Sequence, residues 1–312
     1  MTTFAFVFPG QGSQAVGMLE AWGDDAAVRQ TLVEASDALG EDIARLIREG
    51  PKDQLDLTTN TQPVMLTAGI AAYRAWRAEG GAVPTAVAGH SLGEYTALVA
   101  AGVLTLADAL PLVRLRATAM QQAVPVGVGA MAAILGLEAD AVRAGCLAAA
   151  QESGEVVEAV NFNDPKQTVI AGTKAGVEKA CELLKAKGAK RALPLPVSAP
   201  FHSSLMKPAA ARLRERLAAT TFATPRIPVV NNIDVAVETD ATAIRDALYR
   251  QAFGPVRWVE TVQAIRARGV THLIECGPGK VLAGMVKRID AEAHAATLHD
   301  PASMNDVKGV LA

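Results

Sequence analysis

Short, wholly apolar runs alternate with longer amphipathic stretches over the first third of the chain. Phe4–Phe8 is apolar at every position and is ended by a Pro-Gly pair, a pattern typical of a strand buried on both faces of a parallel sheet. The periodic apolar stretch from Thr61 to Ala78 predicts a helix, because Pro63 lies in its first turn and glycines follow its end. Ala86–Gly89 and Leu92–Ala101 predict a second buried strand and a second helix. This alternation indicates an α/β fold built on a parallel sheet.

The middle of the chain predicts a separate unit, which begins in the segment 124–129, rich in proline and glycine. Its apolar pattern predicts elements in the order βαββαβ, which is that of the ferredoxin-like fold. The strands are expected at Ala130–Leu135, Val156–Asn161, Gln167–Ala171 and Lys190–Leu195, and the helices at Ala139–Gln151 and Ala175–Lys187. We therefore predict a larger α/β core, formed by residues 1–125 and 198–312, into which residues 126–197 are inserted as a ferredoxin-like subdomain.

Strands and helices alternate again after the inserted unit. The predicted helices are 205–219, 242–249, 256–267 and one after Gly279, and the predicted strands are Val229–Asn231 and Thr271–Cys276. The remaining C-terminal residues, which include His294 and His299, are expected to form a polar tail.

Composition and charge exclude several classes of protein. Half of the 312 residues are apolar and 20% are charged, which is too hydrophobic for a disordered chain. The formal net charge of −2 argues against a nucleic-acid-binding protein, because such proteins carry a strong basic excess. Three widely spaced cysteines predict neither a disulfide framework nor a zinc site. Since the sequence has no signal-peptide pattern and no membrane-spanning apolar run, we expect a soluble cytoplasmic protein.

Gly89-His90-Ser91-Leu92-Gly93 is the sharpest chemical motif in the chain. A serine between two glycines, placed between a strand and a helix, is typical of a nucleophile elbow, in which the glycines permit a strained turn. Such an elbow would present the Ser91 hydroxyl at the carboxyl end of the sheet. It would also place the Leu92 N–H at a helix N-terminus, where it can stabilise an oxyanion. The alternative is a glycine-flanked turn with an unreactive serine.

A serine nucleophile needs a general base, and five histidines are available. His90 adjoins the serine and is expected to shape the turn or line the pocket. His272 begins a predicted strand and two histidines fall in the polar tail, which leaves His202 in a proline-bounded loop before a predicted helix. His202 is therefore the candidate base, although its position alone is equally compatible with a surface or helix-capping histidine. No Asp or Glu stands out as the third member of a triad.

Three motifs, in this order and spacing, resemble those of the malonyl-CoA:acyl carrier protein transacylases. They are Phe8–Gln14, Gly89–Glu94 and Phe201-His202-Ser203. Further matching stretches are Asn60–Pro63, Arg114–Arg116 with Met120-Gln121, Gly129–Ala133, Val230–Asn232 and Glu275–Lys280, so the similarity extends over roughly residues 3–290. The resemblance implies a hydrolase-like α/β core with an inserted ferredoxin-like subdomain.

The resemblance also implies how the catalytic tasks are divided. Ser91 matches the acylated nucleophile of the family and His202 matches its base. Gln11 matches a residue that orients the oxyanion region together with the Leu92 amide. The backbone carbonyl of Gln251 matches the group that supports the histidine in place of a triad carboxylate, which would explain why no acidic third member is found.

Other matching positions concern the substrate. Arg116 matches the arginine that pairs with the free malonyl carboxylate, a task suited to the two parallel hydrogen bonds of a guanidinium. Arg114 lies two residues away on a predicted helix, so the two arginines cannot share a face, and periodicity does not say which points inward. Gln62 matches a pocket-lining glutamine. Phe201 matches a residue that crowds out α-branched acyl groups, or it packs without such a role; Ala117 replaces a glycine found in many relatives.

The implied reaction transfers malonyl from malonyl-CoA to the phosphopantetheine thiol of an acyl carrier protein, for fatty-acid synthesis, without a cofactor or a metal. The chain is expected to act as a monomer that binds neither nucleic acid nor membranes. Two basic clusters, at 185–191 and 280–288, are candidate docking surfaces for an acidic carrier, although a solvated face is the favoured interpretation of each cluster taken alone. The alternatives are a serine hydrolase with the same elbow and a non-catalytic module that binds the carrier.

Overall fold

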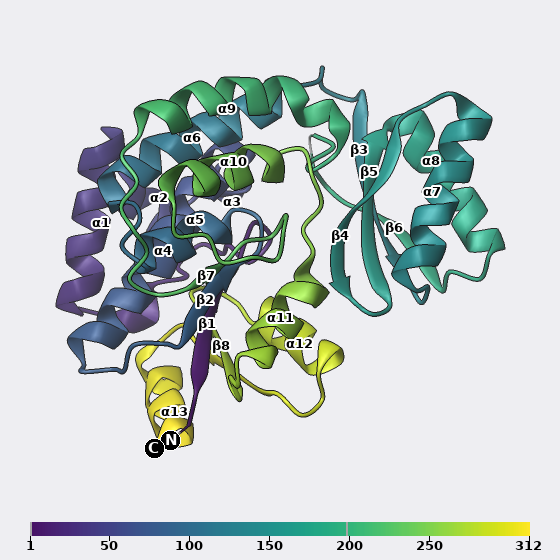
Figure 1. Cartoon of the computed structure of the whole chain (residues 1–312). Helices are drawn as coiled ribbons and strands as arrows, with labels where there is room; N and C mark the ends of the chain where they lie inside the picture. Colours follow the sequence, from purple (N-terminus) through teal and green to yellow (C-terminus); the bar gives the residue numbers. More distant parts are fainter. Residues whose placement is uncertain (1, 198) are drawn as a thin grey trace.

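The computed structural model describes residues 2–197 and 199–312, whose strands form two separate sheets (Figure 1). One sheet is parallel and the other is antiparallel, which confirms the predicted fold class. The predicted start of the second core segment, residue 198, lies outside the described residues. The limits of the inserted subdomain therefore stay a prediction.

The parallel sheet lies at the centre of the larger part of the molecule. Its strands are, in spatial order, β7 (Val229–Val230), β2 (Ala86–Gly89), β1 (Phe4–Phe8), β8 (His272–Cys276) and β9 (His294–Leu298). Every residue of β1 and β2 is buried, as their wholly apolar sequences predict. Alternate residues of β1 enter two different cores. Phe4, Phe6 and Phe8 belong to one, whereas Ala5 and Val7 belong to the other.

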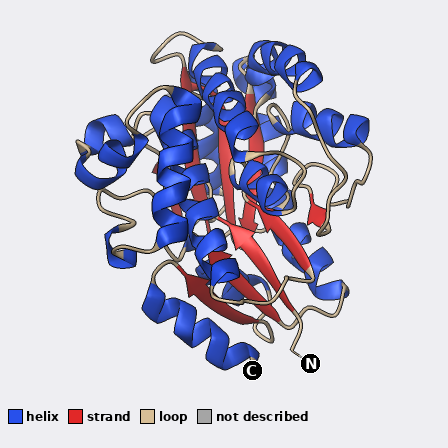
Figure 2. Cartoon of the chain, turned by 90° about the vertical axis from the view of Figure 1, so that its left-hand side faces the viewer, coloured by secondary structure: helices blue, strands red, loops and turns tan. Residues whose placement is uncertain are grey.

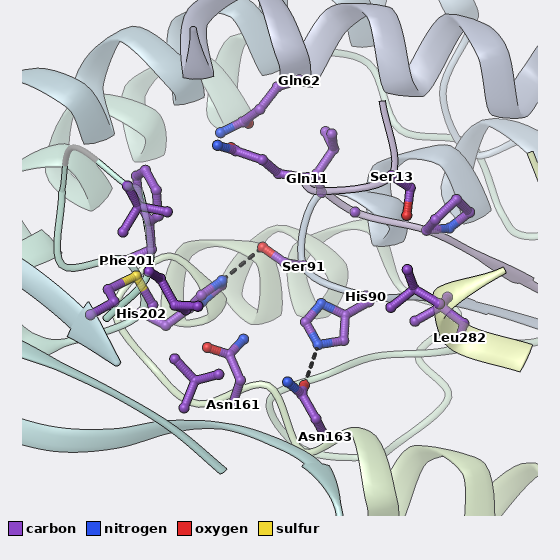
Figure 3. A pocket seen from close by; sticks show the side chains of 18 of the residues that line it. Gln11, Ser13, Gln62, His90, Ser91, Asn161, Asn163, Phe201, His202 and Leu282 are labelled. Atoms are coloured by element: carbon purple, nitrogen blue, oxygen red, sulfur yellow. Dashed lines mark hydrogen bonds between the residues drawn. The ribbon is translucent and has the colours of Figure 1, made fainter. Parts of the chain in front are cut away.

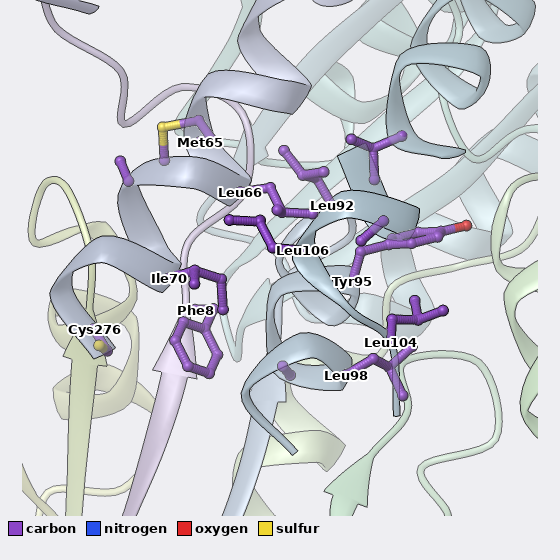
Figure 4. Packing of buried hydrophobic residues seen from close by; sticks show 14 of the residues in the cluster. Phe8, Met65, Leu66, Ile70, Leu92, Tyr95, Leu98, Leu104, Leu106 and Cys276 are labelled. Atoms are coloured by element: carbon purple, nitrogen blue, oxygen red, sulfur yellow. The ribbon is translucent and has the colours of Figure 1, made fainter. Parts of the chain in front are cut away.

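Helices cover both faces of this sheet (Figures 1 and 2). The face that carries the three phenylalanines of β1 packs against several helices in one core. These are α1 (Ala26–Leu39), α2 (Ile43–Glu49), α3 (Lys52–Leu55), α4 (Thr58–Ala78), α5 (Gly93–Ala100), α6 (Leu106–Gln122), α9 (Lys207–Ala219), α10 (Ala241–Gln251) and α13 (Pro301–Leu311). Figure 4 shows part of this core, where Phe8 lies with Leu66 and Ile70 of α4. The opposite face packs with α11 (Trp258–Ala267) and α12 (Val281–Ile289).

The antiparallel sheet has the ferredoxin-like order of elements. Its strands are, in spatial order, β4 (Val157–Asp164), β5 (Gln167–Thr173), β3 (Gly129–Leu135) and β6 (Arg191–Pro194). Helices α7 (Ala139–Ser153) and α8 (Lys174–Ala186) cover one face and form a small core with it. On the other face, Met131, Val160 and Val169 form a cluster with Phe201, which follows the sheet in the sequence.

In the N-terminal half, one predicted boundary is wrong and one segment was left without a prediction. Helix α4 begins at Thr58, three residues before its predicted start, because Asn60 and Thr61 both donate their N–H groups to the Leu57 carbonyl. Pro63 therefore lies inside the helix. The predicted start was too late because proline is usually found in the first turn of a helix. The segment 20–55, for which no element was predicted, forms the 3₁₀ helix Glu20–Trp22 and helices α1 to α3.

The predicted polar tail is also wrong, because residues 294–311 form β9 and α13. β9 pairs in parallel with β8, from His272 opposite His294 to Cys276 opposite Leu298. It is an edge strand whose residues are mostly half-exposed, so it lacks the continuous apolar run that marks a central strand. α13 begins with a capping box formed by Asp300 and Ser303 and buries only three side chains among residues 301–311.

Candidate active site

The turn between β2 and α5 holds Ser91 in a left-handed conformation, with φ of 52°. Such a φ strains a residue with a side chain and is typical of a nucleophile elbow. The flanking glycines are sterically required. A Cβ on Gly89 would lie 1.9 Å from the carbonyl of Gly93, and a Cβ on Gly93 would lie 2.1 Å from the carbonyl oxygen of Phe8. The elbow can therefore form only because both positions lack a side chain.

The loop after β1 packs directly against the elbow. A Cβ on Gly10 would lie 2.6 Å from the His90 carbonyl oxygen, so the two backbones are in contact. This contact brings Gln11 to the mouth of the elbow, where its side chain donates to Thr58 Oγ1 at 3.2 Å. In the part of the chain that the structure describes, the backbone N–H groups of Gln11 and Leu92 donate no hydrogen bond. Both are free to bind an oxyanion.

His202 lies beside Ser91 (Figure 3), although the strands of the antiparallel sheet separate the two residues in the sequence. Its Nε2 lies 2.7 Å from Ser91 Oγ, and its Nδ1 lies 2.9 Å from the backbone carbonyl oxygen of Gln251. Because a carbonyl can only accept, Nδ1 carries the proton and Nε2 is left to accept one from the serine. The Gln251 carbonyl thus occupies the place of a triad acid.

Burial keeps His202 neutral. Its side chain lies in the interior and faces the Arg116 guanidinium, and together these lower the pKa of His202 to about 3. Its backbone φ is 65°, a second strained non-glycine residue at the site. At neutral pH the imidazole is therefore an unprotonated base aimed at Ser91.

Arg116, on α6, is fully buried and points at the nucleophile. It donates to Gln62 Oε1 at 2.8 Å, to Gln251 Oε1 at 3.0 Å and to Ser91 Oγ at 3.1 Å. Burial lowers its pKa, although a guanidinium stays charged. Its carbon centre lies 5.4 Å from the centre of the Tyr95 ring. Arg114 faces elsewhere and pairs with Glu41, so the structure answers which arginine points inward.

Ser91 lines a pocket of about 210 Å³, whose walls are formed by the antiparallel sheet and by loops and helices of the larger core. Polar side chains line the pocket with Ser91 and His202, among them Gln11 and Gln62 (Figure 3). Arg116 lines it too. The rest of the wall is apolar, from Met120, Met131, Val169, Leu195, Val197, Phe201, Leu282 and Met285. An apolar wall around one buried cation suits a short acyl group that ends in a carboxylate.

His90 forms part of the wall. Its Nε2 lies 2.8 Å from Asn163 Oδ1, and its ring lies 5.5 Å from that of Trp258. Burial lowers its pKa, so it is neutral at pH 7. Because its ring contacts Asn163 of β4, the His90 side chain points toward the antiparallel sheet and lines the pocket. His272 and His294 stack on one another at the opposite end of their strands, which leaves them outside this pocket.

Two side chains that support the elbow were not found from the sequence. Asn232 Oδ1 accepts the Ser91 N–H at 2.7 Å, and its Nδ2 donates to the Gly89 carbonyl at 2.8 Å. Glu94 accepts the backbone N–H of Asn232 at 2.9 Å from within α5. Both residues fall in matching stretches of the sequence, Gly89–Glu94 and Val230–Asn232, but no role was expected of either.

The described residues contain neither a metal-binding cluster nor a membrane-spanning helix. Residues 2–197 and 199–312 contain no group of three or more His, Cys, Asp and Glu side chains placed to hold a metal ion. Within those same ranges, no helix is long and apolar enough to span a bilayer.

Comparison with known proteins identifies the family. Residues 5–302 match the family described as Acyl transferase domain. A Salmonella typhimurium protein named Malonyl CoA-acyl carrier protein transacylase is 54% identical over 306 residues, which are 98% of each chain. A Bacillus subtilis protein of the same name is 46% identical over 302 residues, covering 96% of this chain and 95% of the relative.

Solved structures agree with this assignment. The crystal structure of an acyl-carrier-protein S-malonyltransferase from Burkholderia pseudomallei has a TM-score of 0.96 and 69% identity, and the match covers 98% of this chain and 99% of that one. A malonyl-transacylase in complex with a type II polyketide acyl-carrier protein has a TM-score of 0.95 and 50% identity, covering 97% and 98%. The chain therefore belongs to the acyl transferase family, among the malonyl CoA-acyl carrier protein transacylases.

Proposed function

We propose that this protein transfers a malonyl group from malonyl-CoA to the phosphopantetheine thiol of an acyl carrier protein and so supplies fatty-acid elongation. The observation that carries the proposal is the convergence of a serine, its neutral base and a buried arginine in one pocket. The distances are 2.7 Å from Ser91 Oγ to His202 and 3.1 Å from Ser91 Oγ to Arg116. The relatives' names support the same reaction.

The first half-reaction acylates the serine. His202 Nε2 takes the hydroxyl proton while Ser91 Oγ attacks the thioester carbonyl of malonyl-CoA. Negative charge moves to the carbonyl oxygen, which the free N–H groups of Gln11 and Leu92 can bind. The C–S bond then breaks, CoA leaves as a thiol with the proton from His202, and an ester remains on Ser91.

The second half-reaction reverses these proton transfers. His202 takes the proton of the carrier thiol, whose sulfur attacks the ester carbonyl. The C–O bond breaks, and Ser91 recovers its proton from the imidazolium. Since the phosphopantetheine arm arrives on the carrier protein, we expect the enzyme to need no resident cofactor.

Arg116 selects the acyl group in this proposal. Its guanidinium is desolvated and bonded only to neutral oxygen atoms of Gln62, Gln251 and Ser91 among the described residues. A malonyl carboxylate would give it two charge-assisted hydrogen bonds, whereas an acetyl group would give none. Phe201 and the other apolar side chains of the wall limit the access of water to the ester, which favours transfer over hydrolysis.

Intact-mass spectrometry tests the proposal. On incubation with malonyl-CoA, the wild-type chain should gain one malonyl group, and Ser91→Ala should gain none. Added holo-carrier protein should remove the group from the enzyme and appear in malonylated form. Formation of the adduct in Ser91→Ala would contradict the assignment of Ser91 as the nucleophile. Loss of the malonyl group to water at the same rate with and without the carrier would indicate a hydrolase.

A further inference from the structure

A buried carboxylate lies beneath the nucleophile without lining its pocket. Glu94, in the first turn of α5, is 2% exposed. Its Oε2 accepts two hydrogen bonds, from the backbone N–H of Asn232 at 2.9 Å and from Gln251 Nε2 at 3.0 Å. We infer that Glu94 is a positioning residue, which holds the nucleophile and the base in alignment through these two neighbours. The inference rests on the proposed acyl transfer.

The first neighbour fixes the elbow. Asn232 accepts the Ser91 N–H at 2.7 Å and donates to the Gly89 carbonyl at 2.8 Å, so it binds the strained turn on both sides of His90. Its own backbone N–H is held by Glu94. The strained φ of Ser91 persists only if surrounding contacts determine it, and these three hydrogen bonds are such contacts.

The second neighbour joins the remaining groups. The side chain of Gln251 donates from Nε2 to the Ser91 carbonyl at 3.0 Å as well as to Glu94, and its Oε1 accepts from Arg116 at 3.0 Å. The backbone carbonyl of the same residue accepts from His202. One residue thus contacts the nucleophile, the base and the arginine.

The carboxylate decides which way the Gln251 amide points. A carboxylate only accepts, so it requires the NH₂ group of Gln251 to face it. The amide oxygen then faces Arg116, which only donates. With the amide turned over, an oxygen would face Glu94 and an NH₂ group would face the guanidinium. Glu94, together with the Ser91 carbonyl and Arg116, therefore sets the orientation of the Gln251 side chain.

The charges around Glu94 give this role a measurable signature. Arg116 on α6 favours its ionised form, whereas Asp234, beyond β7, disfavours it, and Tyr95 and Glu238 also lie beside it. Burial outweighs the favourable contacts and raises the pKa of Glu94 to about 7. The pKa of His202 is about 3, so protonation of the base cannot account for a fall in activity just below pH 7.

The test compares Glu94→Gln and Glu94→Leu with the wild-type full-length chain and with Glu275→Gln. Glu275 is a matched control, because it is equally buried and its pKa is also raised to about 7, yet it accepts from the Ala283 N–H on α12 and shares no partner with Ser91. The rate of Ser91 acylation by malonyl-CoA is measured by quenched intact-mass spectrometry between about pH 5.5 and 9. Thermal unfolding confirms that each variant is folded.

The wild-type rate should fall as the pH drops through about 7, because Glu94 loses its charge. Glu94→Gln should lose this acid limb and show a rate about tenfold below the wild-type plateau, since a neutral amide oxygen is a weaker acceptor. Glu94→Leu should lose about 100-fold in kcat with little change in KM, as expected when reacting groups are misaligned. Glu275→Gln should keep the acid limb.

An unchanged rate and acid limb in Glu94→Gln would overturn the inference, and this variant decides the matter if Glu94→Leu fails to fold. A fluorophosphonate that labels reactive serines separates this inference from the proposed function. If the wild-type chain forms no malonyl adduct, the proposed function fails. Slower fluorophosphonate labelling of Glu94→Gln than of the wild type then still supports the positioning role, and equal labelling contradicts it.

Discussion

Arg116 is a buried cation with no charged hydrogen-bond acceptor among the described residues. Its hydrogen-bond acceptors among the described residues are neutral oxygens, and the ring of Tyr95 covers part of it. A cation in this state is costly to bury, and an incoming carboxylate compensates part of that cost. The same cation lowers the pKa of His202 and keeps the base unprotonated. One side chain thus serves both substrate selection and the ionisation state of the base.

Arg116→Ala should therefore discriminate between acyl groups. We expect the rate of malonyl transfer to fall on the order of 100-fold, which corresponds to a loss of about 3 kcal/mol of transition-state stabilisation. The rate of acetyl transfer should be retained or rise. The rates of Ser91 acylation by malonyl-CoA and acetyl-CoA, measured side by side, check this. Arg114→Ala is the control, because Arg114 lies two residues away and pairs with Glu41 outside the pocket. Equal loss of both acyl groups would mean that Arg116 is structural.

The elbow is the element on which the site depends, and its geometry is encoded by glycines. Gly93→Ala would place a Cβ 2.1 Å from the Phe8 carbonyl oxygen, so backbone must move against backbone. We expect a loss of about 3 kcal/mol or more in the free energy of unfolding and loss of acyl-serine formation. Urea unfolding and intact-mass spectrometry measure the two effects.

Gly309→Ala is the matched control for that substitution. Gly309 lies in α13, and a Cβ added there meets no heavy atom within 4 Å. Alanine favours a helix over glycine by about 0.5–1 kcal/mol, so this variant should be slightly stabilised and fully active. If Gly93→Ala proved as harmless as Gly309→Ala, the steric account of the elbow would be wrong.

The elements that sequence predicts well are those whose burial is visible locally. β1 and β2 have the predicted bounds because both are wholly apolar and end at glycine or before Pro-Gly. β9 was missed because an edge strand has little burial to display, and α4 was shortened because Pro63 usually marks a first turn. The local sequence pattern therefore predicts the central strands but not the strand at the edge of the sheet.

The site divides in the same way. Ser91 carries a motif, and elimination with the resemblance points to His202; the structure places these two side chains 2.7 Å apart. Glu94 and Asn232 lie in matching stretches, but no local pattern shows what they do, because their importance lies in contacts across long sequence separations. The orientation of the Gln251 side chain is likewise set by three-dimensional neighbours.

At the scale of the whole molecule, the pocket exists because two sheets are held together. The edge of the antiparallel sheet joins the core through backbone hydrogen bonds, from the Phe162 N–H to the Val256 carbonyl at 2.9 Å and from the Val256 N–H to the Val160 carbonyl at 2.8 Å. An ion pair between the buried Asp164 and Arg288 of α12 lies beside them. These contacts fix the apolar wall that the small sheet presents to Ser91.

Burying carboxyl groups in this core makes the stability of the molecule depend on pH. Burial raises the pKa of Glu275 to about 7 from an ordinary value of 4.5. Below pH 4.5 the group is protonated in both the folded and the unfolded state, so it has no effect. Above pH 7 the folded state must hold an unfavourable charge, which costs about 3 kcal/mol. This penalty therefore develops as the pH rises from about 4.5 to about 7.

Glu275→Gln removes this titration. The free energy of unfolding of the variant, relative to wild type, should rise by about 2.5 kcal/mol as the pH increases from 5 to 8, because only the wild type acquires the buried charge. Urea unfolding at several pH values measures the difference. Glu260→Gln is the control: Arg257 lowers the pKa of Glu260, so that carboxylate is ionised in both states over this range. Parallel stability curves for Glu275→Gln and wild type would show that Glu275 stays ionised throughout, which would contradict its raised pKa.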